Sequence, residues 1–146
     1  MRPSIALRIA SIVTLVLAAG HTSGFPWTPN QTPAGAALVS HMKSIHFDVM
    51  GFSRTYWDFY LGFGLTISVC LLLFAVLLWQ LGAAANTEPQ RARPAIATLF
   101  VGFAAIALLD WLYFFTVPLV MAAAIALCLA LAWASARSRH KAEPAG

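Results

Sequence analysis

Long apolar stretches with almost no charge constrain the fold of this chain more than any other feature of its sequence. They cover residues 4–24, 56–82 and 95–136. A helix that spans a bilayer needs about 20 consecutive apolar residues, so the first two stretches each predict one span. The third is long enough for two, and Pro118 marks the break because proline lacks the amide proton that a helix interior needs. Only 10% of the residues are charged, against about 25% in a soluble domain.

These stretches predict an all-α fold, a membrane-spanning four-helix bundle that forms a single integral membrane domain over residues 1–146. The spans cover about 4–24, 56–82, 95–113 and 118–136, with an outer loop at 25–55, a cytoplasmic loop at 83–94 and a cytoplasmic tail at 137–146. Arg2 and Arg8, followed by an apolar run and the small residues Ala18 and Gly20, also resemble a cleavable signal peptide. We favour the uncleaved helix.

The basic residues set the expected orientation, because the cytoplasmic loops of membrane proteins carry an excess of lysine and arginine. With four spans, Lys43 and Arg54 fall on one side of the membrane. The other seven of the nine basic residues share the side of both termini: Arg2, Arg8, Arg91, Arg93, Arg137, Arg139 and Lys141. We therefore expect a multi-pass protein of a bacterial inner membrane with both termini in the cytoplasm. The expected partner is the lipid bilayer, and the scattered charges predict no contact with nucleic acid.

The outer loop contains one amphipathic pattern. Leu38, Met42, Ile45 and Val49 recur at spacings of three and four residues, which predicts a short outer helix over residues 34–50 with one apolar stripe. Such a helix can lie on the membrane surface or cap the bundle.

Small residues in two spans predict close helix packing. One set lies in the second span, at Gly62, Gly64 and Ser68. Another repeats every four residues in the fourth span, at Ala122, Ala126, Ala130 and Ala134. These two seams make a homodimer, or a complex with a membrane partner subunit, a reasonable expectation.

Two aspartates within the apolar stretches mark the candidate functional site. A carboxylate at membrane depth is costly unless it is paired, hydrated or neutralised, so such residues often belong to working sites. Asp58 and Asp110 both fall towards the outer side, near histidines and basic residues. We predict an outward-facing polar ligand pocket with apolar walls, lined by His21, His41, His46, Arg54, Trp57, Asp58, Tyr60, Asp110 and Trp111.

Each aspartate also has a plainer interpretation. Arg54 and Asp58 are four residues apart, so on a helix they can form an ion pair at the start of the second span. Asp110 can reach the outer water, or cap the turn that follows its helix.

The sequence predicts no cofactor and no metal site. His41 and His46 are five residues apart, whereas ligands on one helical face are three or four apart. Cys70 and Cys128 form no CxxC pair, and we interpret both as small packing residues.

A further pattern lies within residues 21–65, in the groups His21-Thr22, His41-Met42-Lys43, Phe47-Asp48-Val49-Met50-Gly51, Ser53-Arg54, Tyr56-Trp57-Asp58-Phe59-Tyr60 and Gly62-Phe63-Gly64. In these residues the chain resembles a family of small, uncharacterised bacterial membrane proteins with four predicted helices. The resemblance implies a four-helix inner-membrane protein. It implies no activity, substrate or catalytic residue, because none is assigned to the family.

Three functions are compatible with these features. We expect a non-enzymatic protein that binds a small or lipid-like ligand, or a partner subunit, through the outer pocket. An alternative is a membrane enzyme in which His41 or His46 works with Asp58 or Asp110 in acid–base chemistry on a lipid or quinone-like substrate. No nucleophile motif, phosphate loop or cofactor fingerprint supports that alternative. A second alternative is a haem- or metal-binding membrane protein that uses His21 together with His41 or His46 as ligands.

Overall fold

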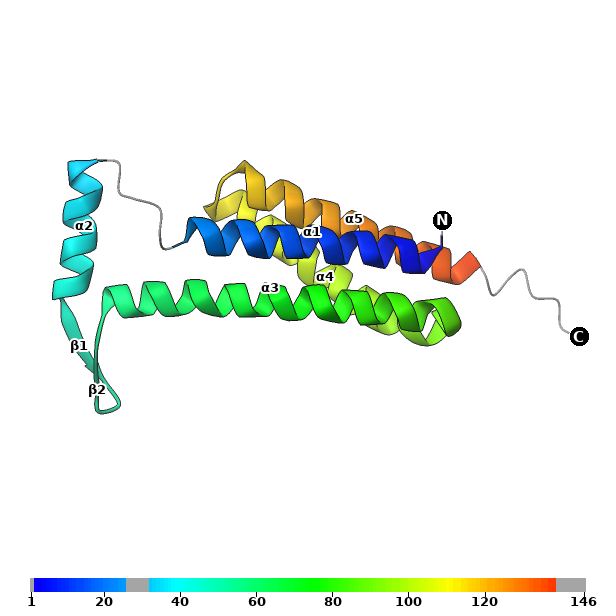
Figure 1. Cartoon of the computed structure of the whole chain (residues 1–146), viewed down its shortest axis with the longest axis horizontal. Coiled ribbons are helices and arrows are strands. Elements are labelled where there is room, and N and C mark those ends of the chain that lie inside the picture. Colours follow the sequence, from blue (N-terminus) through cyan, green and yellow to red (C-terminus); the bar gives the residue numbers. More distant parts are fainter. Residues whose placement is uncertain (1, 26–31, 139–146) are drawn as a thin grey trace, which may run out of the picture. The chain divides into compact units, whose positions relative to one another are not determined.

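The computed structural model describes residues 2–25 and 32–138, which form five helices and one β-hairpin (Figure 1). In chain order the elements are α1 (Pro3–Gly24), α2 (Pro33–Ser44), β1 (His46–Val49), β2 (Phe52–Thr55), α3 (Tyr56–Thr87), α4 (Pro89–Tyr113) and α5 (Thr116–Ser138). Four of these helices, α1, α3, α4 and α5, are long and apolar enough to cross a membrane. The prediction of a mainly helical chain is therefore confirmed, together with four helices that have the length and composition of membrane spans.

The chain divides into two compact units, which we describe separately. The first unit comprises residues 1–18 and 71–146, and the second comprises residues 19–70. Helices α1 and α3 each contribute residues to both units, because the division falls within them.

The first unit is built on stripes of small and branched apolar residues. In α4 the buried stripe recurs every three or four residues, at Ala92, Ile96, Leu99, Phe103, Ile106 and Asp110. In α5 it runs along Ala122, Ile125, Leu129, Ala132 and Ala136. This spacing is that of helices packed at a shallow angle. The alanines let the backbones approach closely, which favours helix association in a membrane.

Helices α1 and α3 add polar contacts to the first unit. The Ser11 hydroxyl donates a hydrogen bond of 2.6 Å to the carbonyl oxygen of Ala75. Further along, Gly82 lies so close to α1 that a Cβ atom there would meet the Ser4 carbonyl oxygen at 3.4 Å. A serine hydroxyl bonded to a backbone carbonyl is satisfied without water, as a membrane interior requires.

Polar contacts join several helix ends at one end of the first unit. The Ser4 hydroxyl contacts the Asn86 side chain at 3.5 Å, and the Gln90 side chain donates to the Ala136 carbonyl oxygen at 3.0 Å. These contacts bring the start of α1, the turn between α3 and α4 and the last turns of α5 to the same end. Two guanidinium groups stack on indole rings in this unit, Arg8 on Trp79 at 5.0 Å and Arg93 on Trp133 at 4.6 Å.

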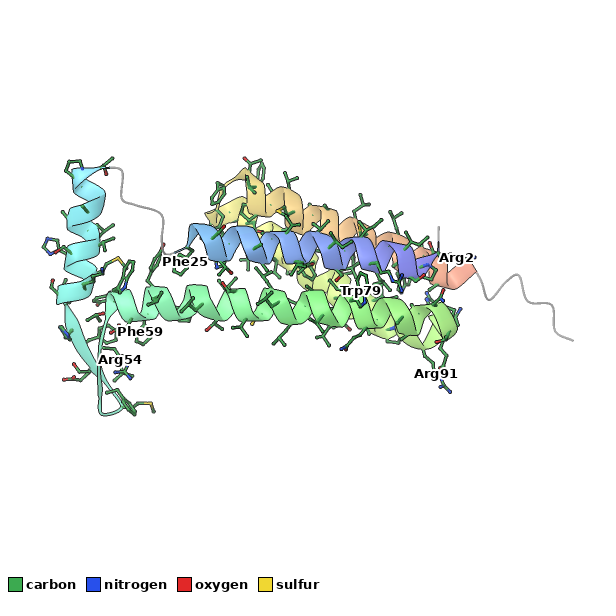
Figure 2. The ribbon with its side chains drawn as sticks, viewed as in Figure 1. Arg2, Phe25, Arg54, Phe59, Trp79 and Arg91 are labelled. Carbon is green, nitrogen blue, oxygen red and sulfur yellow. The ribbon has the colours of Figure 1, made fainter. Side chains whose placement is uncertain are left out.

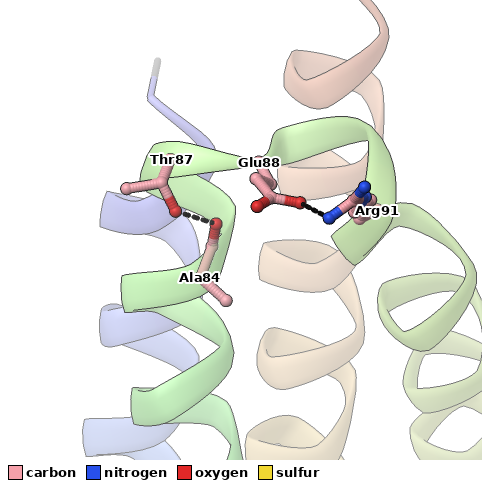
Figure 3. A network of polar contacts seen from close by, with 4 residues as sticks. All are labelled: Ala84, Thr87, Glu88 and Arg91. Carbon is pink, nitrogen blue, oxygen red and sulfur yellow. Dashed lines mark hydrogen bonds and ion pairs between the residues drawn. The ribbon is translucent and has the colours of Figure 1, made fainter.

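The prediction of a polar loop at residues 83–94 is wrong, because that segment is helical except at Glu88. Helix α3 continues to Thr87, and α4 begins at Pro89. The Thr87 hydroxyl donates to the Ala84 carbonyl oxygen at 3.1 Å, and Glu88 forms an ion pair of 2.7 Å with Arg91 (Figure 3). Proline suits the first helical position, so Pro89 starts α4 rather than breaking it.

The second unit contains the other departure from expectation. The predicted helix over residues 34–50 ends at Ser44, and residues 46–55 form an antiparallel hairpin. Ile45 and Val49 fit the helical stripe, but Phe47 and Val49 also alternate with polar neighbours, which is the period of a strand. Positive φ angles at Met50 (52°) and Gly51 (86°) form the two-residue turn of the hairpin.

Helix α2 begins at a well-defined cap in the second unit. The Thr32 hydroxyl accepts a hydrogen bond of 3.1 Å from the Gly35 amide, and Pro33 occupies the first helical position. Threonine at the cap followed by proline is a strong helix-start pattern. The helix ends where the chain turns into β1.

Candidate functional site

Asp58 caps the start of α3. Its carboxylate accepts a hydrogen bond of 2.8 Å from the Thr55 amide, and the Thr55 hydroxyl accepts one of 3.1 Å from the Asp58 amide. This reciprocal pair is a capping box, in which two unpaired amides at a helix start are satisfied by side chains. A carboxylate at this position also interacts favourably with the helix dipole. The local sequence therefore gives Asp58 a structural role.

The ion pair predicted between Arg54 and Asp58 is not formed. Arg54 lies in β2 rather than on the helix, so the two residues do not share a helical face. Its guanidinium donates a hydrogen bond of 2.8 Å to the Ser53 carbonyl oxygen and lies 5.3 Å from the centre of the Phe52 ring.

Removing the capping box should destabilise the start of α3. We expect Asp58→Ala and Thr55→Ala each to lower the free energy of unfolding by about 1 kcal/mol. The double variant should lose less than the sum, because the two residues share their hydrogen bonds. Unfolding in mixed detergent micelles, followed by circular dichroism, measures these changes. Asp48→Ala, in β1, is the control; a loss as large as that of Asp58→Ala would contradict the capping role.

Aromatic side chains gather around the first turns of α3, and we call this set the aromatic cluster. It joins the residue that follows α1 with residues of the hairpin and α3: Phe25, Phe47, Tyr56, Trp57, Phe59, Tyr60 and Phe63. Phe25 meets Tyr60 edge to face at 4.7 Å, and Trp57 lies 5.4 Å from Tyr60. The Lys43 ammonium group lies 4.8 Å from the centre of the Trp57 ring. Such pairs of amphipathic rings and cations are typical of a membrane–water interface.

His21 is held against the same turns of α3. Its Nε2 lies 3.0 Å from the carbonyl oxygen of Gly64, and its ring stacks on Phe25 at 5.7 Å. One turn further along α3, the Thr22 hydroxyl donates to the Ser68 hydroxyl at 2.9 Å. The predicted close approach at Gly64 and Ser68 is thus made by the end of α1, within the second unit.

Asp110 continues the buried apolar stripe of α4 in the first unit. Only 8% of the residue is exposed, whereas the next residue, Trp111, is 70% exposed. Its backbone carbonyl oxygen accepts a hydrogen bond of 3.0 Å from the Phe114 amide. Among the described residues, its carboxyl group has no hydrogen bond or ion pair. A carboxyl group without a partner is costly in an apolar environment.

The nine residues of the predicted pocket therefore fall into different settings. His21, Trp57 and Tyr60 belong to the aromatic cluster or contact it, while Asp58 is a helix cap. Figure 2 labels Phe25 and Phe59, two further members of the cluster. His41, His46 and Arg54 are exposed, and the His46 Nδ1 lies 3.0 Å from the Ser44 carbonyl oxygen. Asp110 and Trp111 belong to the first unit and the other seven residues to the second.

Sequence reasoning missed the part played by Phe25 and Phe47. Neither carries a polar group, so neither entered a search for chemistry. Phe47 stood within a segment interpreted as helix, and its alternation with His46 and Asp48 was the signal for a strand.

No metal site is formed within residues 2–25 and 32–138. No group of three or more histidine, cysteine, aspartate or glutamate side chains in that part of the chain is placed to hold an ion. Cys70 and Cys128 are free thiols.

Comparisons of the chain with protein-family models, curated proteins and solved structures give no match. The resemblance seen in residues 21–65 stays a prediction.

Proposed function

We propose that the chain is a small multi-pass protein of the bacterial inner membrane, whose four spans form a bundle with both termini in the cytoplasm. The contacts of Ser4 with Asn86 and of Gln90 with Ala136 support this topology, because they collect three helix ends at one end of the first unit. Arg2, Arg91 and Arg93 belong to those ends, and an excess of basic residues favours the cytoplasmic side. Helix α2 and the hairpin then belong to the outer side.

We infer that the protein acts by binding rather than by catalysis, and that it takes a small or lipid-like ligand, or a partner subunit, at its outer side. The observation that carries this proposal is the carboxyl group of Asp110. It lies on a buried apolar stripe, one turn before the end of α4, without a partner among the described residues. An ionisable group inside a membrane helix usually serves a function. The chemistry that would satisfy it is a hydrogen-bond donor or a cation.

Native mass spectrometry of the gently solubilised full chain tests this proposal. We expect the wild-type protein to carry a bound species that Asp110→Ala loses, because the methyl group neither accepts a hydrogen bond nor carries a charge. Asp48→Ala, on an exposed strand residue, should keep the species. Equal occupancy in all three proteins would overturn the role of Asp110. A bound haem or metal ion in the wild type would favour the metal-binding alternative instead.

A further inference from the structure

The β-hairpin has two chemically different faces. Its register pairs His46 with Thr55, Phe47 with Arg54, Asp48 with Ser53 and Val49 with Phe52. Because side chains alternate across a strand and directly paired residues share a face, the polar face carries His46, Asp48, Ser53 and Thr55. The other face, which we call the apolar face, carries Phe47, Val49, Phe52 and Arg54.

The apolar face is attached to the side of α3 that bears its aromatic residues. The Phe47 ring lies 5.0 Å from Tyr56 and 5.2 Å from Phe59, and Phe59 meets Phe63 edge to face at 6.0 Å. Tyr56, Phe59 and Phe63 are three and four residues apart, so they form one column on α3. Phe63 is 66% exposed and Tyr56 54% exposed, as expected of side chains that face lipid.

The end of the hairpin exposes large apolar side chains. Met50 is 95% exposed and Phe52 is 62% exposed. Together with Val49, which is paired with Phe52, they form adjacent exposed apolar side chains, and contiguous apolar patches mark interaction surfaces whereas scattered residues do not. The cations nearby are Arg54, which stacks on Phe52, and Lys43, which stacks on Trp57. Asp48 lies on the opposite, polar face, so the charge beside the apolar residues is positive.

We propose that the hairpin is an interfacial membrane anchor, with Val49, Met50 and Phe52 in the outer acyl boundary and Arg54 at the level of the lipid phosphates. The occupant of the apolar face is the bilayer that α3 crosses. Thr55 is followed at once by Tyr56, the first residue of that span, so the hairpin has no linker with which to leave the surface. Four strand residues reach roughly 13 Å, which keeps the turn beside the head groups. This proposal depends on the membrane-spanning helices and not on a ligand at Asp110.

Spin-label accessibility along the hairpin tests the proposal. Single cysteines are placed in the full chain with Cys70→Ala and Cys128→Ala, labelled, and reconstituted in vesicles of phosphatidylcholine and phosphatidylglycerol. Oxygen concentrates in lipid and a nickel chelate in water. We expect Val49→Cys and Phe52→Cys to be more accessible to oxygen, and the adjacent pair Asp48→Cys and Ser53→Cys to the chelate. The measured quantity is the ratio of oxygen to chelate accessibility, which should reverse between neighbouring residues.

Met50→Cys is a further variant that should not disturb the hairpin, because Met50 lies in the turn and is almost fully exposed. We expect its label, like those at 49 and 52, to be more accessible to oxygen than to the chelate. Chelate access at 49, 50 and 52 equal to that at 48 and 53 would place the apolar face in water and overturn the proposal. Protection of 49, 50 and 52 from both reagents would overturn it as well, because that result indicates a protein partner or a second copy of the chain.

Discussion

Replacing Phe103 with alanine is expected to lower the free energy of unfolding by about 3 kcal/mol, the lower end of the range for buried phenylalanine. Phe103 lies midway along the stripe of α4, is 2% exposed, and meets Phe74 edge to face at 5.7 Å. Helices in a membrane associate mainly through close packing, because lipid is as apolar as their side chains. The loss therefore comes from the cavity and from van der Waals contacts that nothing replaces.

Phe100→Ala is the matched control on the same helix. Phe100 is 38% exposed, so a lipid chain can fill the space that the ring leaves. We expect a change well below that of Phe103→Ala in a denaturation series with increasing dodecyl sulfate. Similar losses for both variants would show that the stripe of α4 is not the packing seam of the first unit.

Gly64→Ala should destabilise the second unit although alanine is the better helix former. A Cβ atom at this position would clash with the ring of Phe25, which lies directly over the glycine. Overpacking of this kind costs typically about 1–3 kcal/mol, against a gain of about 1 kcal/mol from replacing glycine inside a helix. The net loss should be accompanied by displacement of His21, whose Nε2 contacts the Gly64 carbonyl oxygen.

Gly62→Ala separates packing from helix propensity. Nothing lies within 4 Å of a Cβ atom built at Gly62, so only the propensity gain remains, about 0.5–1 kcal/mol of added stability. Thermal unfolding of the two variants in one detergent compares them directly. Adding Phe25→Ala to Gly64→Ala should recover part of the loss; if it does not, the clash with Phe25 is not the cause.

The four apolar helices were predictable because a bilayer requires a length and a composition that are visible in the hydropathy of the sequence. The ends of these helices were harder to predict. The sequence placed a boundary at Gly82 and another before Ala95, since glycine and proline usually end helices, yet Gly82 instead allows α1 to approach α3. Packing between α1 and α3 explains the glycine at position 82, and no local sequence pattern predicts that contact.

The helix start at Asp58 was predicted from the sequence, but the hydrogen-bond partner of that residue was not. Asp58 was correctly placed at the start of a helix, but its partner is Thr55 rather than Arg54. That difference follows from the hairpin: once residues 52–55 form a strand, Arg54 leaves the helical register and Thr55 becomes the cap. Residues 45–50 were predicted to be helical although they enter a strand, and the predicted ion pair between Arg54 and Asp58 was wrong because it also assumed a helix.

The two small-residue seams predicted from the sequence are only partly covered inside one chain. Gly64 is covered by Phe25, and Ser68 is bonded to Thr22. In α5, Ala122 and Ala126 are buried within the first unit, whereas Ala134 is exposed. Part of each seam is therefore in contact inside one chain, while Gly62 and Ala134 are exposed. The homodimer stays a prediction.

The connection through Glu88 alone has a consequence for biogenesis. Helices α3 and α4 are joined through one non-helical residue, so almost no loop separates them. They should insert together as a helical hairpin, so that any inversion of topology would turn both at once. A topology reporter inserted at this turn would separate the two helices, and so it would not report on which side of the membrane the turn lies.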